Sequence, residues 1–131
     1  MNQNTFAFIF PGQGAQYVGM GREFFDAYAE ARALYEEADD ILHFALSKVI
    51  FEGPESTLKE TRYCQAAIYV TSLAILQVLK RKYNLPSPIA TGGLSLGEYS
   101  ALVAAEKLSF QDGLKLVFER GRLMHEACEK N

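Results

Sequence analysis

The residue pattern with the clearest chemical meaning is Gly93-Leu94-Ser95-Leu96-Gly97, which fits G-x-S-x-G. A short apolar run precedes it and a helical pattern follows it. A serine at the apex of a strand-to-helix turn takes a strained backbone conformation, and small residues two positions away let strand and helix pass each other. Its hydroxyl then lies at a helix N-terminus, where free N–H groups favour a developing oxyanion. Ser95 is therefore predicted to be a nucleophile, against the alternative of a chance match in a glycine-rich turn.

Arg120 is the second residue whose surroundings suggest chemistry. On a helical wheel, five apolar side chains fall within about 60° of it: Leu116, Val117, Leu123, Met124 and Ala127. A guanidinium in an apolar arc is costly unless an anion meets it, whereas Arg122 lies among charged neighbours. The arc predicts an anion site at Arg120. A salt bridge to an internal carboxylate, or a side chain that reaches out to water, explains the wheel equally well.

The histidines and cysteines offer no clear partner for the serine. A serine hydroxyl needs a nearby imidazole to accept its proton, and the chain contains His43 and His125 alone. His125 follows Arg120 by five residues, which turns it about 140° away around a helix. Cys64 and Cys128 lack metal-ligand spacing and are expected to be buried, unreactive thiols. No metal and no cofactor is expected.

Composition predicts one soluble globular domain. The 131 residues are 49% hydrophobic and 22% charged, with a formal net charge of −3, which excludes a disordered chain. Without a basic block, nucleic acid and membrane surfaces are not expected partners. The first apolar run, residues 6–10, stops at Pro11 and is too short for a signal peptide. With two cysteines, a reducing cytoplasm fits best.

The elements that must position Ser95 and Arg120 can be predicted from periodicity. Residues 6–10 and 89–91 are expected to be strands, the first buried on both faces. Spacings of three and four residues predict helices over about 21–40, 63–82, 97–105 and from 109 to the end. Thr57 and Glu60 resemble a capping box, and Ser109 with Asp112 marks the start of the last helix.

This order predicts an α/β fold with a parallel sheet. The uncharged stretch 63–79 is at the lower limit of length for a membrane span, and a buried core helix is the preferred interpretation. Two strands are too few to cover such a helix, so the chain is expected to be part of a larger fold. The isolated chain is expected to be oligomeric, aggregation-prone or only partly folded unless a partner or self-association covers its apolar surface.

Three motifs together resemble the malonyl-CoA:acyl carrier protein transacylase family. They are Phe10-Pro-Gly-Gln-Gly-Ala-Gln16, Gly93-Leu-Ser-Leu-Gly-Glu-Tyr-Ser-Ala-Leu102 and Arg120-Gly-Arg-Leu-Met124, in the family's order and spacing. The resemblance implies an α/β-hydrolase-like large subdomain with a nucleophile elbow and an inserted ferredoxin-like subdomain. Residues 1–131 resemble the N-terminal portion of the large subdomain, with the insert and the C-terminal half absent.

The resemblance also implies roles. Ser95 would carry a malonyl group from malonyl-CoA to the phosphopantetheine thiol of acyl carrier protein. Gln13 and Leu96 would supply backbone N–H groups to the oxyanion hole, and Arg120 would bind the free carboxylate of the malonyl group. Gln65 resembles a family glutamine near the active site and would bind the substrate, although Ala66 stands where the family usually has proline.

Two departures from the family pattern bear on activity. Leu94 stands where the family usually has histidine before the nucleophile, which is expected to alter packing. The family's catalytic histidine lies downstream of residue 131, so the isolated chain is expected to be inactive. Two alternatives remain open: a serine esterase or thioesterase, which has no need of the carboxylate-binding Arg120, and a non-catalytic fragment or assembly module.

Overall fold

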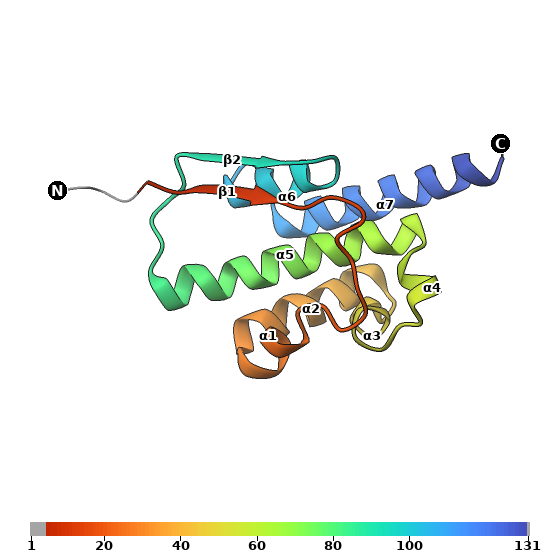
Figure 1. The fold of residues 1–131 in the computed structure, drawn as a ribbon, viewed down its shortest axis with the longest axis horizontal. Coiled ribbons are helices and arrows are strands. Elements are labelled where there is room, and N and C mark those ends of the chain that lie inside the picture. The colour runs from red at the N-terminus through yellow and green to blue at the C-terminus, as the bar shows by residue number, and fades with distance from the viewer. Residues whose placement is uncertain (1–4, 131) are drawn as a thin grey trace.

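A computed structural model describes residues 5–130 of the chain, and Figure 1 shows their arrangement. In chain order the elements are β1 (Ala7–Phe10), α1 (Arg22–Ala27), α2 (Ala29–Leu42), α3 (Leu46–Glu52), α4 (Glu55–Leu58), α5 (Thr61–Tyr83), β2 (Ala90–Gly93), α6 (Gly97–Ala104) and α7 (Phe110–Glu129). The long helix α5 runs between the two strands and a group formed by α1, α2 and α3 (Figure 1). The predicted α/β class is confirmed, with a small sheet and mostly helices.

The sheet consists of β1 and β2, which pair in parallel with Ala7 opposite Ala90 and Phe10 opposite Gly93. This register brings the carboxyl ends of both strands to one edge. The prediction that β1 is buried on both faces is wrong, because Ile9 is 78% exposed and Phe10 is the buried residue of the strand. Within residues 5–130 the sheet has no third strand, so β1 and β2 each keep an unpaired edge.

The helix expected over 21–40 is two helices, α1 and α2. Tyr28 separates them with an extended backbone, φ −129° and ψ 121°. Its hydroxyl accepts a hydrogen bond from Lys82 Nζ at 3.1 Å, near the end of α5. The break between α1 and α2 thus coincides with a contact to a distant part of the chain, and the spacing of apolar residues alone does not reveal it.

The helix expected over 63–82 is α5, and it forms the centre of the core. Eleven of its residues between Cys64 and Val78 are buried. It is the one described helix long and apolar enough to cross a membrane, yet 61% of its most apolar window is buried inside the fold. Gly121 allows α7 to pack closely against it, since a Cβ there would lie 2.7 Å from the carbonyl oxygen of Thr61.

The two predicted caps have opposite outcomes. Ser109 Oγ accepts a hydrogen bond from the Asp112 amide at 3.1 Å, which confirms the start of α7. The capping box at Thr57 and Glu60 is wrong: Thr57 lies within α4, and Glu60 precedes α5 without a side-chain cap. The Glu60 carboxylate instead accepts a hydrogen bond from Arg62 Nε at 2.8 Å.

The two cysteines lie in different surroundings. Cys64 is buried as predicted, and burial raises the pKa of its thiol to about 11. Cys128 is exposed, so its predicted burial is wrong. The last turns of α7 extend past the start of α5, where no described element covers them (Figure 1).

Candidate active site

Ser95 lies in the turn between β2 and α6, and its backbone is in the left-handed region with φ 55°. The flanking glycines explain how such a tight turn can form. A Cβ on Gly93 would lie 2.1 Å from the carbonyl group of Gly97, and one on Gly97 would lie 2.6 Å from the carbonyl oxygen of Phe10. The predicted strand, strained serine and helix are therefore present, and the Ser95 side chain is exposed.

The loop after β1 lies beside this turn. A Cβ on Gly12 would approach the carbonyl oxygen of Leu94 to 2.6 Å, so only a glycine fits there without movement. Gln13 follows in the same loop, and its side-chain amide donates to Thr61 Oγ1 at 3.4 Å. Leu94 is 76% exposed. Two segments distant in sequence thus meet at the carboxyl end of the sheet, where ligands bind in open parallel sheets.

Two backbone N–H groups in these segments are not used by hydrogen bonds within the described residues. The first turn of α6 uses the amides of Gly97, Glu98 and Tyr99, which donate to carbonyl oxygens three residues earlier. The amides of Leu96 and Gln13 have no intramolecular acceptor within residues 5–130. A free N–H directly after an exposed serine, at the start of a helix, can stabilise negative charge on an adjacent oxygen.

Arg120 projects from α7 to Ser95. Its Nη2 donates to Ser95 Oγ at 2.7 Å, its Nη1 donates to Gln65 Oε1 at 2.5 Å, and its guanidinium carbon lies 6.0 Å from the centre of the Tyr99 ring. In the part of the chain that the structure describes, no carboxylate lies within 4.0 Å of this guanidinium. The alternative of an internal salt bridge is therefore wrong for the described residues.

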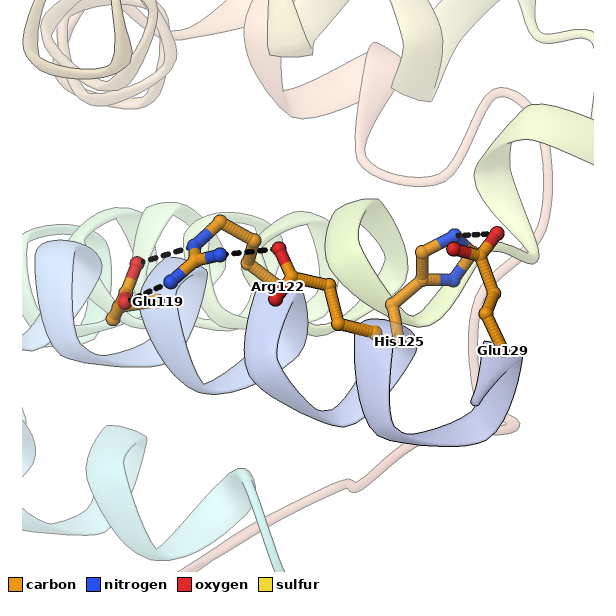
Figure 2. A network of polar contacts seen from close by, with 5 residues as sticks. Glu119, Arg122, His125 and Glu129 are labelled. Atoms are coloured by element: carbon orange, nitrogen blue, oxygen red, sulfur yellow. Dashed lines mark hydrogen bonds and ion pairs between the residues drawn. The ribbon is translucent and has the colours of Figure 1, made fainter. Parts of the chain in front are cut away.

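Arg122, two residues further along and on another side of α7, provides the contrast. It pairs with Glu119 (Figure 2) and also with Glu126, and these carboxylates raise its pKa further above its usual range. The wheel analysis thus separates the two arginines correctly. Arg122 is neutralised within its own helix, while the charge of Arg120 remains available beside Ser95.

Gln65 lies on α5, accepts a hydrogen bond from this arginine and is 1% exposed. Besides accepting from Arg120, its side chain donates through Nε2 to Met124 Sδ at 3.3 Å. Tyr99 and these Gln65 contacts are features that the sequence reasoning did not assign. The spacing offers a signal for Tyr99, which follows Ser95 by four residues, and for Met124, which follows Arg120 by one helical turn.

Neither histidine is hydrogen-bonded to Ser95. His125 Nε2 lies 3.3 Å from Glu129 Oε1 on the last turns of α7 (Figure 2). His43 is the exposed residue that ends α2, with its backbone in the left-handed region. Among residues 5–130, no group of three or more histidine, cysteine or acidic side chains could hold a metal ion. The site as described consists of an exposed serine in a strained turn, two backbone amides without an intramolecular acceptor and an arginine without a carboxylate partner, a set suited to acyl transfer from an anionic substrate.

Comparison with known proteins identifies the chain as an acyltransferase domain. Residues 7–130 match the acyl transferase domain family, and the chain belongs to that family. It is 48% identical over 121 residues to the malonyl CoA-acyl carrier protein transacylase of Bacillus subtilis strain 168, an alignment that covers 92% of this chain and 38% of the relative.

Solved structures give the same result. The malonyl CoA-acyl carrier protein transacylase of Clostridium perfringens superposes with a TM-score of 0.87 at 42% identity, covering 95% of this chain and 39% of that one. A chain from the complex between a type II polyketide synthase acyl carrier protein and its malonyl-transacylase superposes with a TM-score of 0.88 at 40% identity, covering 95% of this chain and 40% of that one. The chain spans about two-fifths of the length of these relatives.

Proposed function

We propose that this chain supplies the nucleophile and the acyl-selecting arginine of an enzyme that moves malonyl groups from malonyl-CoA to acyl carrier protein. The observation that carries the proposal is the contact between Arg120 Nη2 and Ser95 Oγ at 2.7 Å, made by a guanidinium with no carboxylate partner among the described residues. The malonyl carboxylate and the reacting thioester would then be bound by adjacent side chains. The names of the relatives agree with this substrate and this acceptor.

The first half-reaction would form a malonyl ester on Ser95. Ser95 Oγ attacks the thioester carbonyl carbon while an imidazole accepts its proton, and the amides of Gln13 and Leu96 stabilise the oxyanion. The carbon–sulfur bond then breaks, and coenzyme A leaves as the thiol with that proton. In the second half-reaction the phosphopantetheine thiol attacks the ester, and the serine hydroxyl is regenerated.

Arg120 would select the acyl group. A guanidinium presents five N–H donors in a planar fork that matches a carboxylate. Nη1 and Nη2 of Arg120 each donate one N–H group at the site, to Gln65 and to Ser95, and each keeps a second one for a carboxylate. A charge-assisted, bidentate contact contributes about 2–4 kcal/mol, or roughly 30- to 1000-fold in preference for malonyl over acetyl. An esterase that releases its acyl group to water would have no use for this charge.

The chain would occupy the N-terminal portion of an α/β-hydrolase-like large subdomain. Further strands of that subdomain would pair with the open edges of β1 and β2, and the imidazole that accepts the serine proton would come from the remainder of the enzyme, since neither histidine contacts Ser95. We place the enzyme in the cytoplasm, with malonyl-CoA as substrate and no separate cofactor. A non-catalytic assembly module is the second candidate, favoured by this lack of a histidine at Ser95.

A chimera tests the proposal. Residues 7–130 would replace the matching segment of the Bacillus subtilis relative, which supplies the remaining length, and malonyl transfer from malonyl-CoA to acyl carrier protein would be measured. We expect transfer at a rate comparable with the parent. A folded chimera that transfers no malonyl group would contradict the proposal and favour the assembly module, while release of free malonate without transfer would favour a thioesterase.

A further inference from the structure

We infer that Gln65 is a positioning residue, which holds the Arg120 guanidinium at Ser95 with a neutral acceptor and so keeps its charge available for the acyl carboxylate. This inference rests on the proposed function for the identity of the anion. It gives Gln65 a role through Arg120, in place of the direct substrate contact that the family resemblance implies.

The burial of Gln65 is the first observation. At 1% exposure it lies among the apolar buried residues of α5, where a carboxamide is costly unless both of its ends are hydrogen-bonded. Both ends are directed to α7: Oε1 accepts from Arg120 Nη1 at 2.5 Å, and Nε2 donates to Met124 Sδ at 3.3 Å. One side chain of α5 therefore engages two side chains of α7 that lie one turn apart.

These two contacts fix the direction of the amide. If the amide were turned over, its NH2 group would face the N–H donors of Arg120, and its oxygen would face a sulfur that has no proton to donate. The observed orientation is the one in which Arg120 meets an acceptor. The second nitrogen, Nη2, is thereby placed 2.7 Å from Ser95 Oγ.

The neutrality of Gln65 matters because a glutamate side chain has the same length and could accept the same hydrogen bond. Arg122 shows the result of that alternative on the same helix, since its glutamate partners neutralise it. A glutamate at position 65 would form a buried ion pair with Arg120, and such pairs are strong when solvent is excluded. Glutamine accepts the same hydrogen bond without cancelling the charge.

Binding of malonate to the chimera with the Bacillus subtilis relative, measured by calorimetry, tests the charge argument. We expect Gln65→Glu to weaken binding by about 30-fold or more, because the new carboxylate competes for Arg120. Gln77→Glu is the matched control: it adds the same charge to an exposed position of the same helix. It should change the dissociation constant by less than about 2-fold. Equal affinities for the chimera with glutamine at position 65 and for Gln65→Glu would overturn the inference.

Nuclear magnetic resonance of the Arg120 guanidinium tests the positioning argument without any ligand. Held at two nitrogens, the group should show separate Nη signals in the chimera with glutamine at position 65. Gln65→Met in the same chimera should merge these signals while the backbone spectrum remains that of a folded protein. Unchanged separate signals in Gln65→Met would overturn the inference, and this readout decides the matter if Gln65→Glu fails to fold. Failure of the chimera to transfer malonyl groups would instead count against the proposed function alone.

Discussion

Arg120 of α7 and Ser95 of the turn between β2 and α6 are joined by a hydrogen bond of 2.7 Å, although they lie 25 residues apart in the chain. The contact depends on two close approaches of the backbone. Gly121 lets α7 lie against the start of α5, and Gly93 and Gly97 allow the turn that exposes Ser95. The Ser95 hydroxyl and the Arg120 guanidinium are therefore placed side by side by the packing of the fold, with Gln65 of α5 hydrogen-bonded to Arg120.

Replacing Arg120 with alanine should change which acyl group the enzyme prefers. In the chimera with the Bacillus subtilis relative, Arg120→Ala should reduce malonyl transfer by roughly 30- to 1000-fold, because the carboxylate loses a charge-assisted contact. Acetyl transfer should fall much less, since acetyl carries no charge. Arg122→Ala, which removes an arginine already paired within α7, is the control and should leave the ratio unchanged. Equal losses of both activities in Arg120→Ala would make that arginine structural.

The turn around Ser95 should be sensitive to a single methyl group at Gly93. A Cβ there would lie 2.1 Å from the Gly97 carbonyl, so Gly93→Ala should lower the free energy of unfolding of the chain by about 3 kcal/mol or more. The neighbouring Gly92→Ala makes only an ordinary contact, 3.5 Å from Ile9 Cδ1, and should cost less than about 1 kcal/mol. Urea denaturation compares the two, and similar losses would show that crowding at Gly93 is not the cause.

Tyr35 should make the fold sensitive to alkaline pH. Burial raises its pKa from 10.0 to about 12, although its hydrogen bond to Thr71 acts in the opposite direction. The folded state therefore keeps the phenol neutral where the unfolded state ionises. Its contribution to stability is complete below pH 10 and is lost as the pH rises to 12, which amounts to about 2–3 kcal/mol.

The variant Tyr35→Phe isolates this effect. The difference in unfolding free energy between wild type and variant should fall between pH 10 and 12, while Tyr69, whose pKa burial also raises, contributes equally to both proteins. Denaturation curves at several pH values measure the difference. A difference that stays constant across this range would contradict the assigned cause.

The strained turn at Ser95 and the position of Arg120 on α7 could be predicted from the sequence, because each depends on residues that are close together in the chain. The Gly93 and Gly97 spacing reports a steric requirement within five residues, and the apolar arc around Arg120 reports one face of one helix. Ser109 caps α7 for the same kind of reason, through a hydrogen bond to Asp112. Each of these features depends on neighbours in the chain, so its type and spacing are sufficient evidence.

Other features depend on contacts between distant segments and could not be read in this way. The break at Tyr28 coincides with a hydrogen bond from Lys82, and the orientation of Gln65 depends on two residues of α7. The exposure of Ile9 could not be predicted, because an apolar strand sequence does not show which other elements cover its two faces. The expected association or partial folding of the isolated chain stays a prediction, motivated by exposed apolar residues such as Ile9, Ile89 and Leu94.

Intact-protein mass spectrometry of the chimera after incubation with malonyl-CoA alone tests most directly whether Ser95 is the acyl-carrying nucleophile. Without acyl carrier protein the second half-reaction cannot occur, so the ester should accumulate. We predict a gain of the mass of one malonyl group, located on the peptide that contains Ser95, and no gain in Ser95→Ala. A malonyl adduct that persists in Ser95→Ala would contradict the account, as would a folded wild-type chimera that transfers malonyl groups without ever carrying one on Ser95.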